Sequence, residues 1–271
     1  MKLPRGTFYM LVGSQADSEN IWLFANSGIA RELTRNPEHF GISNFDASVA
    51  GVVVADPVGG GVDQLAKLIA GGSTMPLNSG NGGHALAGAI SGSGRIAFLT
   101  APYKGSTWRI GLKDSFSAVP TWIYASASKS LSGPSQPSFG PGSLLAIVDP
   151  SQGSDPPPRV LTRGSNGWRP VRSSVVNANS IVMSPRGNAA LLTTNGNRSC
   201  VLNTVTGTVL WLPRGWFGMA WSPNGVQIIA AKGSELGLAQ GSDPGAVDLI
   251  GKFEAGFGAA QIVWLARPAK L

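Results

Sequence analysis

The chain repeats one pattern along its length: an apolar strand, a short turn that contains Gly, and a second apolar strand. A repeat of this kind constrains a fold strongly, because each copy buries its apolar faces only by stacking against its neighbours. The clearest copies are Met-Ala-Trp-Ser-Pro-Asn-Gly-Val-Gln-Ile-Ile-Ala at 219–230 and Ile-Val-Met-Ser-Pro-Arg-Gly-Asn-Ala-Ala-Leu-Leu at 181–192. Weaker copies occupy residues 45–54, 88–99 and 137–145, and residues 261–265 repeat only the first strand.

The spacing of the repeat indicates the number of units. We take the residue before each turn as a marker; the markers are Ala47, Ile90, Phe139, Met183, Trp221 and Trp264. They are separated by 43, 49, 44, 38 and 43 residues, and propeller blades of four short strands run about 40–45 residues. We therefore predict an all-β fold, a six-bladed β-propeller that forms a single domain over residues 1–271. Five and seven blades are the alternatives.

The turns of the two clearest copies resemble those of a known family. Trp-Ser-Pro-Asn-Gly at 221–225 and Met-Ser-Pro-Arg-Gly at 183–187 are similar to the turn of the TolB-type (WD-like) β-propeller repeat, usually written W/F-S-P-D-G. Residues 21–24 and 28–34 resemble that family's third strand, hairpin and fourth strand. No copy in this chain keeps the Asp before Gly. The resemblance implies a propeller, and because the family consists mostly of scaffolds and ligand-binding modules, it does not fix a function.

The two ends of the chain complement each other. Residues 7–12 have the pattern of a second strand with no first strand before it, and residues 260–265 supply a first strand with nothing after it. One blade built from both ends would close the ring and remove the exposed edges of an open sheet. We predict that these two strands pair. We also expect positive φ at Gly187 and Gly225, since both follow the turn residues that call for it.

The sequence offers little for catalysis. Cys200 is the single cysteine, so an intrachain disulfide is excluded, and His39 and His84 are the only histidines, a thin supply for a zinc site or a Ser/His/Asp triad. Asp56 and Asp149 each precede Pro after a second strand, where a turn is the favoured interpretation and a paired-carboxylate enzyme the alternative. We expect no catalytic residue, no metal and no cofactor.

Charge is distributed unevenly along the chain. Between Pro156 and Ser234 there are eight basic residues and no Asp or Glu, whereas the rest of the chain holds 13 basic and 14 acidic residues. The formal net charge of +7 therefore comes from this basic sector. A region of one sign steers anionic partners, phosphates or acidic proteins. A basic surface with no specific partner is the alternative, and nucleic acid is disfavoured because the arginines are dispersed and no nucleic-acid motif accompanies them.

Aromatic residues recur in segments that we interpret as the connections into the channel strands. These segments are residues 38–41, 167–170, 215–218 and 256–258. If they share one face, Trp and Arg there would form a contact surface, since these residues dominate binding hot spots. Packing between blades is the alternative role for the aromatic rings. The predicted binding residues are Trp168, Arg169, Arg172, Arg214, Trp216 and Phe217.

These features predict a non-catalytic propeller scaffold that binds a partner protein or an anionic ligand at the channel mouth. A structural subunit of a large assembly, such as a virion or secretion particle, is one alternative. A small hydrolase or lyase that uses channel-mouth carboxylates is another. The longest apolar run near the start, Phe8 to Val12, is too short for a signal peptide, and no run is long enough to cross a membrane. We expect no membrane insertion, and a location in the cytoplasm or in a particle assembled there.

Overall fold

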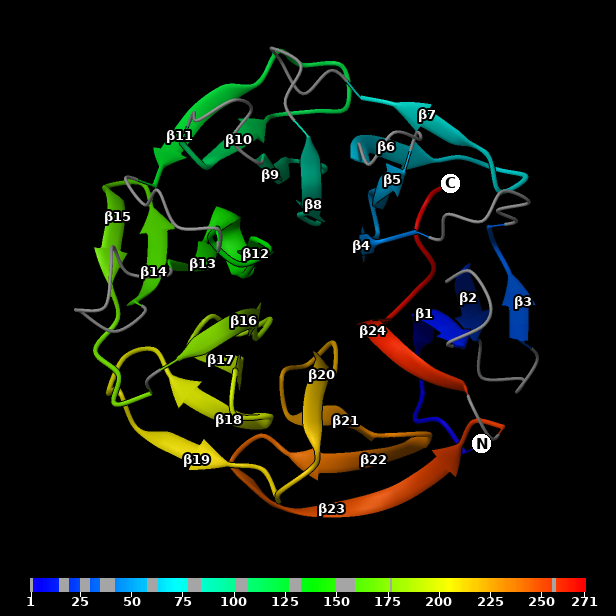
Figure 1. Cartoon of the computed structure of the whole chain (residues 1–271), viewed down its shortest axis with the longest axis vertical. Helices are drawn as coiled ribbons and strands as arrows, with labels where there is room; N and C mark the ends of the chain where they lie inside the picture. Colours follow the sequence, from blue (N-terminus) through cyan, green and yellow to red (C-terminus); the bar gives the residue numbers. More distant parts are fainter. Residues whose placement is uncertain are drawn as a thin grey trace.

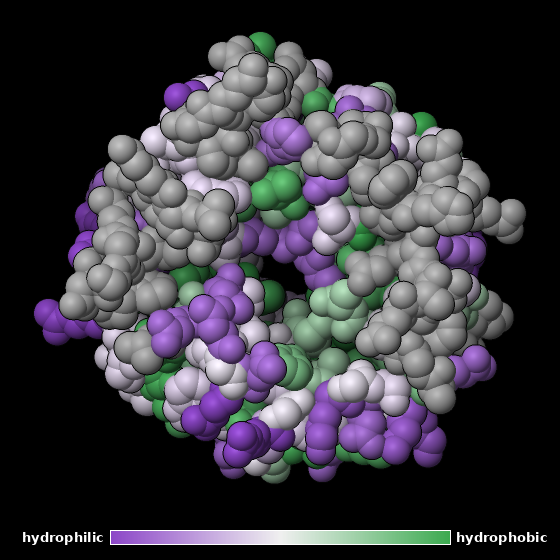
Figure 2. All heavy atoms as spheres, viewed as in Figure 1, coloured by the Kyte–Doolittle hydropathy of each residue, from purple (hydrophilic) through white to green (hydrophobic). Residues whose placement is uncertain are grey.

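The computed structural model describes residues 2–14, 20–24, 30–34, 42–57, 63–77, 84–100, 107–126, 133–149, 159–175, 177–254 and 257–271. Within these residues, 24 strands form six antiparallel sheets of four strands each. The sheets are arranged as blades around a central opening, so the predicted six-bladed propeller is confirmed (Figures 1 and 2). No helix in the described part of the chain is long and apolar enough to cross a membrane.

Each blade runs from an innermost strand at the opening to an outermost strand at the rim (Figure 1). Blade 1 contains β24 (Phe257–Leu265), β1 (Thr7–Ser14), β2 (Asn20–Phe24) and β3 (Ala30–Glu32); blade 2 contains β4 (Asn44–Ser48), β5 (Gly51–Pro57), β6 (Asp63–Leu68) and β7 (Thr74–Pro76). Blade 3 contains β8 (Ala85–Ile90), β9 (Ile96–Thr100), β10 (Arg109–Lys113) and β11 (Thr121–Ala125). Blade 4 contains β12 (Ser138–Phe139), β13 (Leu145–Asp149), β14 (Arg159–Gly164) and β15 (Gly167–Pro170), with a 3-10 turn at Pro141–Ser143. Blade 5 contains β16 (Ala178–Met183), β17 (Ala189–Thr194), β18 (Arg198–Asn203) and β19 (Val209–Trp211); blade 6 contains β20 (Phe217–Trp221), β21 (Gln227–Lys232), β22 (Glu235–Gln240) and β23 (Asp243–Lys252).

The two ends of the chain close the ring in blade 1. Strand β24 pairs antiparallel with β1, with Phe8 opposite Trp264 and Met10 opposite Ile262. The Trp264 ring stacks on Phe8 at a centroid distance of 5.0 Å, and its Nε1 donates to the carbonyl of Arg5. The predicted pairing of the terminal strands is therefore confirmed.

The core lies between the blades, as β1 illustrates. Phe8 and Met10 pack toward blade 6, whereas Tyr9 and Leu11 pack toward blade 2, and all four are buried. Successive side chains of a strand point to opposite faces, so a strand covered on both faces reads as a continuous apolar run. Burial of each such side chain contributes about 1.5–3 kcal/mol, which explains why the blades hold together without disulfides.

The turns after the innermost strands require a left-handed backbone. Gly187 has φ 77° and Gly225 has φ 67°, which confirms the prediction for both glycines. In blade 4 the equivalent position, four residues after the marker Phe139, is occupied by Ser143 with φ 81°. A non-glycine residue pays a steric cost in this conformation, so blade 4 keeps the turn at some expense of stability.

Candidate functional site

Two of the predicted binding residues lie at the rim. Trp168 and Arg169 belong to β15, the outermost strand of blade 4, and not to a connection into a channel strand; that placement was wrong. The reason is the turn before them, because Ser165 and Asn166 form a two-residue hairpin loop between the paired Gly164 and Gly167, and this loop leads into a fourth strand. Trp168 Nε1 donates to the Ile123 carbonyl at 2.8 Å, so its indole joins blades 3 and 4.

The other four residues lie farther along the chain. Arg172 is exposed and follows β15. Arg214 is exposed and Trp216 is half-buried, both between β19 and β20, and Trp216 packs against Gly237 of β22. Phe217 is the first residue of β20 and is the only one of the six that lines the cavity at the central channel.

The predicted surface is not gathered on one face. Across blade 4, Trp168 is opposite Arg163, Arg163 is opposite Leu145, and Leu145 is opposite Phe139. Trp168 therefore lies level with Phe139, the last residue of the innermost strand β12. Trp216 instead precedes the first residue of the innermost strand β20. The two tryptophans therefore lie at opposite ends of their blades, and the prediction of one common face is wrong, while binding by each residue stays a prediction.

The remaining candidate positions are the two histidines and the two carboxylates that precede proline. Residues 38–41, including His39, and Gly256 lie outside the described residues. Asp56 and Asp149 end the second strands of their blades and accept hydrogen bonds from the hydroxyls of Thr74 and Ser126, and neither lines the cavities of the channel. In the described ranges, no group of three His, Cys, Asp or Glu residues is placed to hold a metal ion.

The channel widens at the end where the chain enters the innermost strands. A cavity of about 460 Å³, which we call the vestibule, is lined there by residues of blades 1, 2, 4, 5 and 6. Its apolar lining includes Ile181, Phe217 and Met219, and its polar lining includes Asn44, Gln136 and Gln261. None of the described residues of the lining carries a charged side chain, so the vestibule suits an uncharged group.

Three amide side chains cross the channel below the vestibule and form what we call the amide belt: Asn44 of blade 2, Gln136 of blade 4 and Gln261 of blade 1. Asn44 Nδ2 donates to Gln136 Oε1 at 2.7 Å, and Gln261 Nε2 donates to the same oxygen at 3.2 Å. Gln261 also pairs with the backbone N–H and C=O of Phe45, and Gln136 Nε2 donates to the Gly88 carbonyl at 2.9 Å. The belt therefore satisfies backbone groups on the open edges of the innermost strands, which burial would otherwise leave unpaired.

One atom of the belt has no partner. Asn44 Oδ1 is buried and accepts no hydrogen bond from any described residue. A buried acceptor without a donor costs about 1–3 kcal/mol. Asn44 also lines the vestibule, so this unpaired acceptor belongs to a residue of the cavity wall.

The opposite end of the channel contains a smaller cavity of about 160 Å³, which we call the exit cavity. Asp46 lines it, and the Asp46 carboxylate accepts a hydrogen bond from the Ile90 backbone N–H at 2.8 Å. Burial raises the pKa of Asp46 from 3.8 to about 7, partly offset by hydrogen bonds from the backbone of Ile90 and Ala47. Ser138 holds the equivalent position in blade 4, where its hydroxyl accepts from the Met183 N–H at 2.9 Å. Both side chains therefore link the innermost strands of neighbouring blades.

The belt was not predicted from the sequence, because an isolated Asn or Gln within a strand belongs to no recognised motif. A signal was nevertheless present: Asn44, Gln136 and Gln261 each stand three residues before a repeat marker. The same offset gives Ala87, Ser180 and Gly218 in the other blades. Amides in three blades and small residues in the other three would have predicted a belt with open space beside blades 5 and 6.

Two basic residues stand close to the vestibule. Lys232 ends β21 next to Gly233, which lines the cavity, and its side chain lies against Gly215, beside Arg214. Across the described ranges, the ion pairs are Arg95 with Asp114 and Lys252 with Glu235, so the basic sector contributes to neither. Among the described residues, no carboxylate therefore neutralises the basic sector through a salt bridge.

Comparison with known proteins identifies the fold. No protein-family model matches the sequence, and no curated protein matches it. TolB from Acinetobacter baumannii is similar in structure with a TM-score of 0.75 at 12% identity, over 97% of this chain and 67% of that chain. A chain from a nidogen/laminin complex has a TM-score of 0.70 at 12% identity, over 97% and 99% of the two chains. A gluconolactonase from Xanthomonas campestris has a TM-score of 0.59 at 13% identity, over 85% and 79%.

At these identities the similarity concerns the fold. The resemblance of the repeat to the TolB type is confirmed at that level, and the chain has the fold of a six-bladed propeller. One similar structure comes from a protein complex and another from an enzyme, so the fold alone does not decide between binding and catalysis.

Proposed function

We propose that this propeller is a non-catalytic binding module that accepts an uncharged segment of a partner protein in the vestibule. The observation that carries the proposal is the unpartnered Asn44 Oδ1, buried in the lining of a cavity of about 460 Å³. Peptide main chain and amide side chains supply the N–H donor that this oxygen lacks. Phe217 and Met219 offer apolar contact area beside it.

The chemistry of the channel supports binding over catalysis. Among the described residues, the lining of the vestibule contains no titratable side chain, and the lining of the exit cavity contains one, Asp46. Hydrolysis by paired carboxylates needs two acids about 5–10 Å apart. The uncharged vestibule also favours a protein segment over an anionic ligand at this place. Arg214 and Lys232 then act outside the cavity, by attracting the partner before it docks.

Selection from a display library of random 12-residue peptides tests the proposal. Ala260 is exposed and lines the vestibule, so Ala260→Trp fills its mouth without altering the core. Val119→Trp is the matched control, because Val119 is 79% exposed and lies in blade 3, which does not contribute to the vestibule. Peptides selected on the wild type are expected to bind Ala260→Trp at least tenfold more weakly and Val119→Trp with unchanged affinity. Equal binding to Ala260→Trp, or no peptide that depends on the vestibule, would contradict the proposal.

A further inference from the structure

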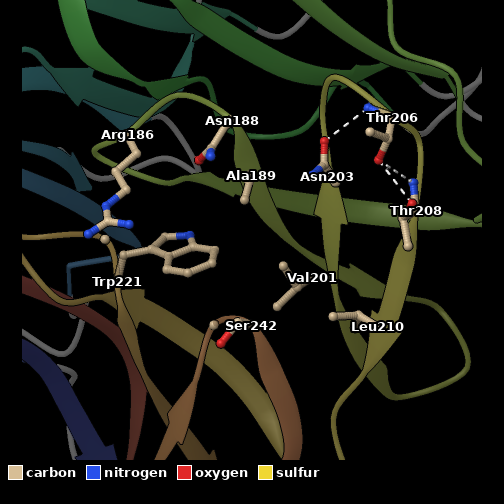
Figure 3. A pocket seen from close by; sticks show the side chains of 12 residues that line it. Arg186, Asn188, Ala189, Val201, Asn203, Thr206, Thr208, Leu210, Trp221 and Ser242 are labelled. Atoms are coloured by element: carbon tan, nitrogen blue, oxygen red, sulfur yellow. Dashed lines mark hydrogen bonds between the residues drawn. The ribbon is translucent and has the colours of Figure 1, made fainter.

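Between blades 5 and 6 the space between the sheets opens into a groove of about 470 Å³, shown in Figure 3. The groove shares Trp221 with the exit cavity and no residue with the vestibule. Ala189, Val201, Leu210 and Trp221 give it an apolar floor, and the Leu210 side chain is 39% exposed. An apolar floor open to solvent is a feature of binding surfaces.

Hydrogen bonds hold the walls of this groove in place. Asn203 Oδ1 accepts from the backbone N–H groups of Val205 and Thr206, both at 2.9 Å, and the hydroxyls of Thr206 and Thr208 lie 2.9 Å apart (Figure 3). On the other wall, Trp221 Nε1 donates to the Val182 carbonyl at 3.0 Å. The floor and walls are therefore formed before any ligand arrives, which reduces the entropy lost on binding.

The rim of the groove carries a positive charge. The Arg186 side chain extends along the groove toward Trp221 (Figure 3), and its Nε donates to the Asn224 carbonyl at 2.8 Å. This bond uses one of the five N–H donors of the guanidinium. The lining contains no carboxylate; Asp243, which follows Ser242 on the blade 6 wall, is the adjacent acid. Arg186 also belongs to the basic sector, which has no acid between Pro156 and Ser234.

We infer that this groove is a second docking site, for an acidic segment of a partner polypeptide. An apolar side chain of the segment packs on Val201 and Leu210, and a carboxylate next to it binds Arg186 in the paired geometry that guanidinium and carboxylate favour. Hydroxyl groups of Thr206, Thr208 and Ser242 line the groove and suit main-chain groups of the segment. The inference is independent of the vestibule, and together the two sites would let one ring hold two partners.

Arrayed peptides test the inference. Each probe is an N-acetylated, C-amidated peptide of seven residues with Leu at the centre, one Asp at one of the other positions, and Gly or Ser elsewhere. The position of the Asp differs from one peptide to the next. The control array carries Asn in place of Asp. Binding is measured by fluorescence anisotropy on the folded full-length chain. Members of the Asp array are expected to bind at least tenfold more tightly than their Asn counterparts. Arg186→Glu and Leu210→Ser should each weaken that binding at least tenfold, and Arg186→Lys should weaken it less than Arg186→Glu.

Arg198→Glu is the matched control, because Arg198 lies on the same blade, stacks on Trp211 at 4.2 Å and is not part of the groove. This variant and Ala260→Trp should bind the peptides within twofold of the wild type, which separates the groove from the vestibule. Equal binding by the Asp and Asn arrays would overturn the inference, as would unchanged binding to a folded Arg186→Glu or Arg186→Gln variant. Self-association that Arg186→Glu abolishes would also overturn it, since the occupant would then be a second copy of this chain.

Discussion

Asp46→Asn is the most informative single substitution for the channel. Asp46 lines the exit cavity, where none of the described lining residues is basic, and burial raises its pKa from 3.8 to about 7. Asparagine has nearly the same shape, and its carbonyl oxygen can still accept the hydrogen bond from the Ile90 N–H. The substitution therefore removes the titration and keeps the link between blades 2 and 3.

The sign and size of the effect follow from the pKa. Below about pH 4 the carboxyl is mostly protonated in both the folded and the unfolded chain, so its ionisation hardly affects the free energy of unfolding. Between pH 4 and pH 7 the unfolded chain ionises while the folded chain keeps its proton, and the wild type progressively loses stability. A difference of about three pKa units, at about 1.36 kcal/mol each, sets an upper limit of about 4 kcal/mol above pH 7. Because Asp46 is half-buried and solvent screens part of the effect, we expect Asp46→Asn to be more stable by about 1–4 kcal/mol at pH 7.5 and within about 1 kcal/mol of the wild type near pH 4.

Urea unfolding followed by tryptophan fluorescence at pH 4, 6 and 7.5 measures this difference. Asp248→Asn is the control, because Asp248 is exposed on β23 and its loss should give no comparable dependence on pH. A difference between Asp46→Asn and the wild type that is constant across the three pH values would refute the reasoning. Lower stability of Asp46→Asn at pH 7.5 would refute it as well.

Three other predictions concern the turns, the closure and the partner. Gly225→Val should lower the free energy of unfolding by more than about 1 kcal/mol, because a β-branched residue at φ 67° is strained and its Cβ would lie 2.8 Å from the Ser184 hydroxyl. Ser143→Gly should instead raise the melting temperature, since glycine adopts a positive φ without the steric cost that serine has there. Deletion of residues 259–271 removes most of β24 and the buried Trp264, whose loss alone should lower the free energy of unfolding by about 3–5 kcal/mol. A truncated chain that melts at the same temperature as the wild type would exclude the role of this strand in closure. For a peptide selected on the vestibule, Arg214→Glu should slow association at low salt and not at high salt, whereas Arg169→Glu on β15 should leave the association rate unchanged. Equal association rates of Arg214→Glu and the wild type at low salt, measured by stopped flow, would contradict the role of the Arg214 charge.

The sequence by itself determined the architecture, because that architecture depends on local patterns. The 38–49-residue spacing of the markers fixed six blades, and the unmatched strands at the two ends fixed the closure through β24 and β1. The positive φ of Gly187 and Gly225 was predictable from the five-residue turn sequences 183–187 and 221–225, in which Gly follows Ser-Pro and one further residue. The segment Gly164–Gly167, with Ser165 and Asn166 between two glycines, also has the composition of a tight hairpin, which indicates another strand and not a connection to the channel.

The tertiary structure alone decided the sites, because they depend on contacts between distant blades. Gln136 and Gln261 are 125 residues apart in the chain, and they meet only because the ring brings the innermost strands to one axis. The open edge of each innermost strand then needs donors and acceptors from across the channel, and the amides of the belt supply them, while Asn44 Oδ1 is left without a donor among the described residues. The partner of the Trp168 indole also comes from another blade, since its N–H donates to the carbonyl of Ile123 in blade 3. Local patterns specify strands and turns, whereas satisfaction of buried polar groups is settled by whichever partners the closed ring brings within reach.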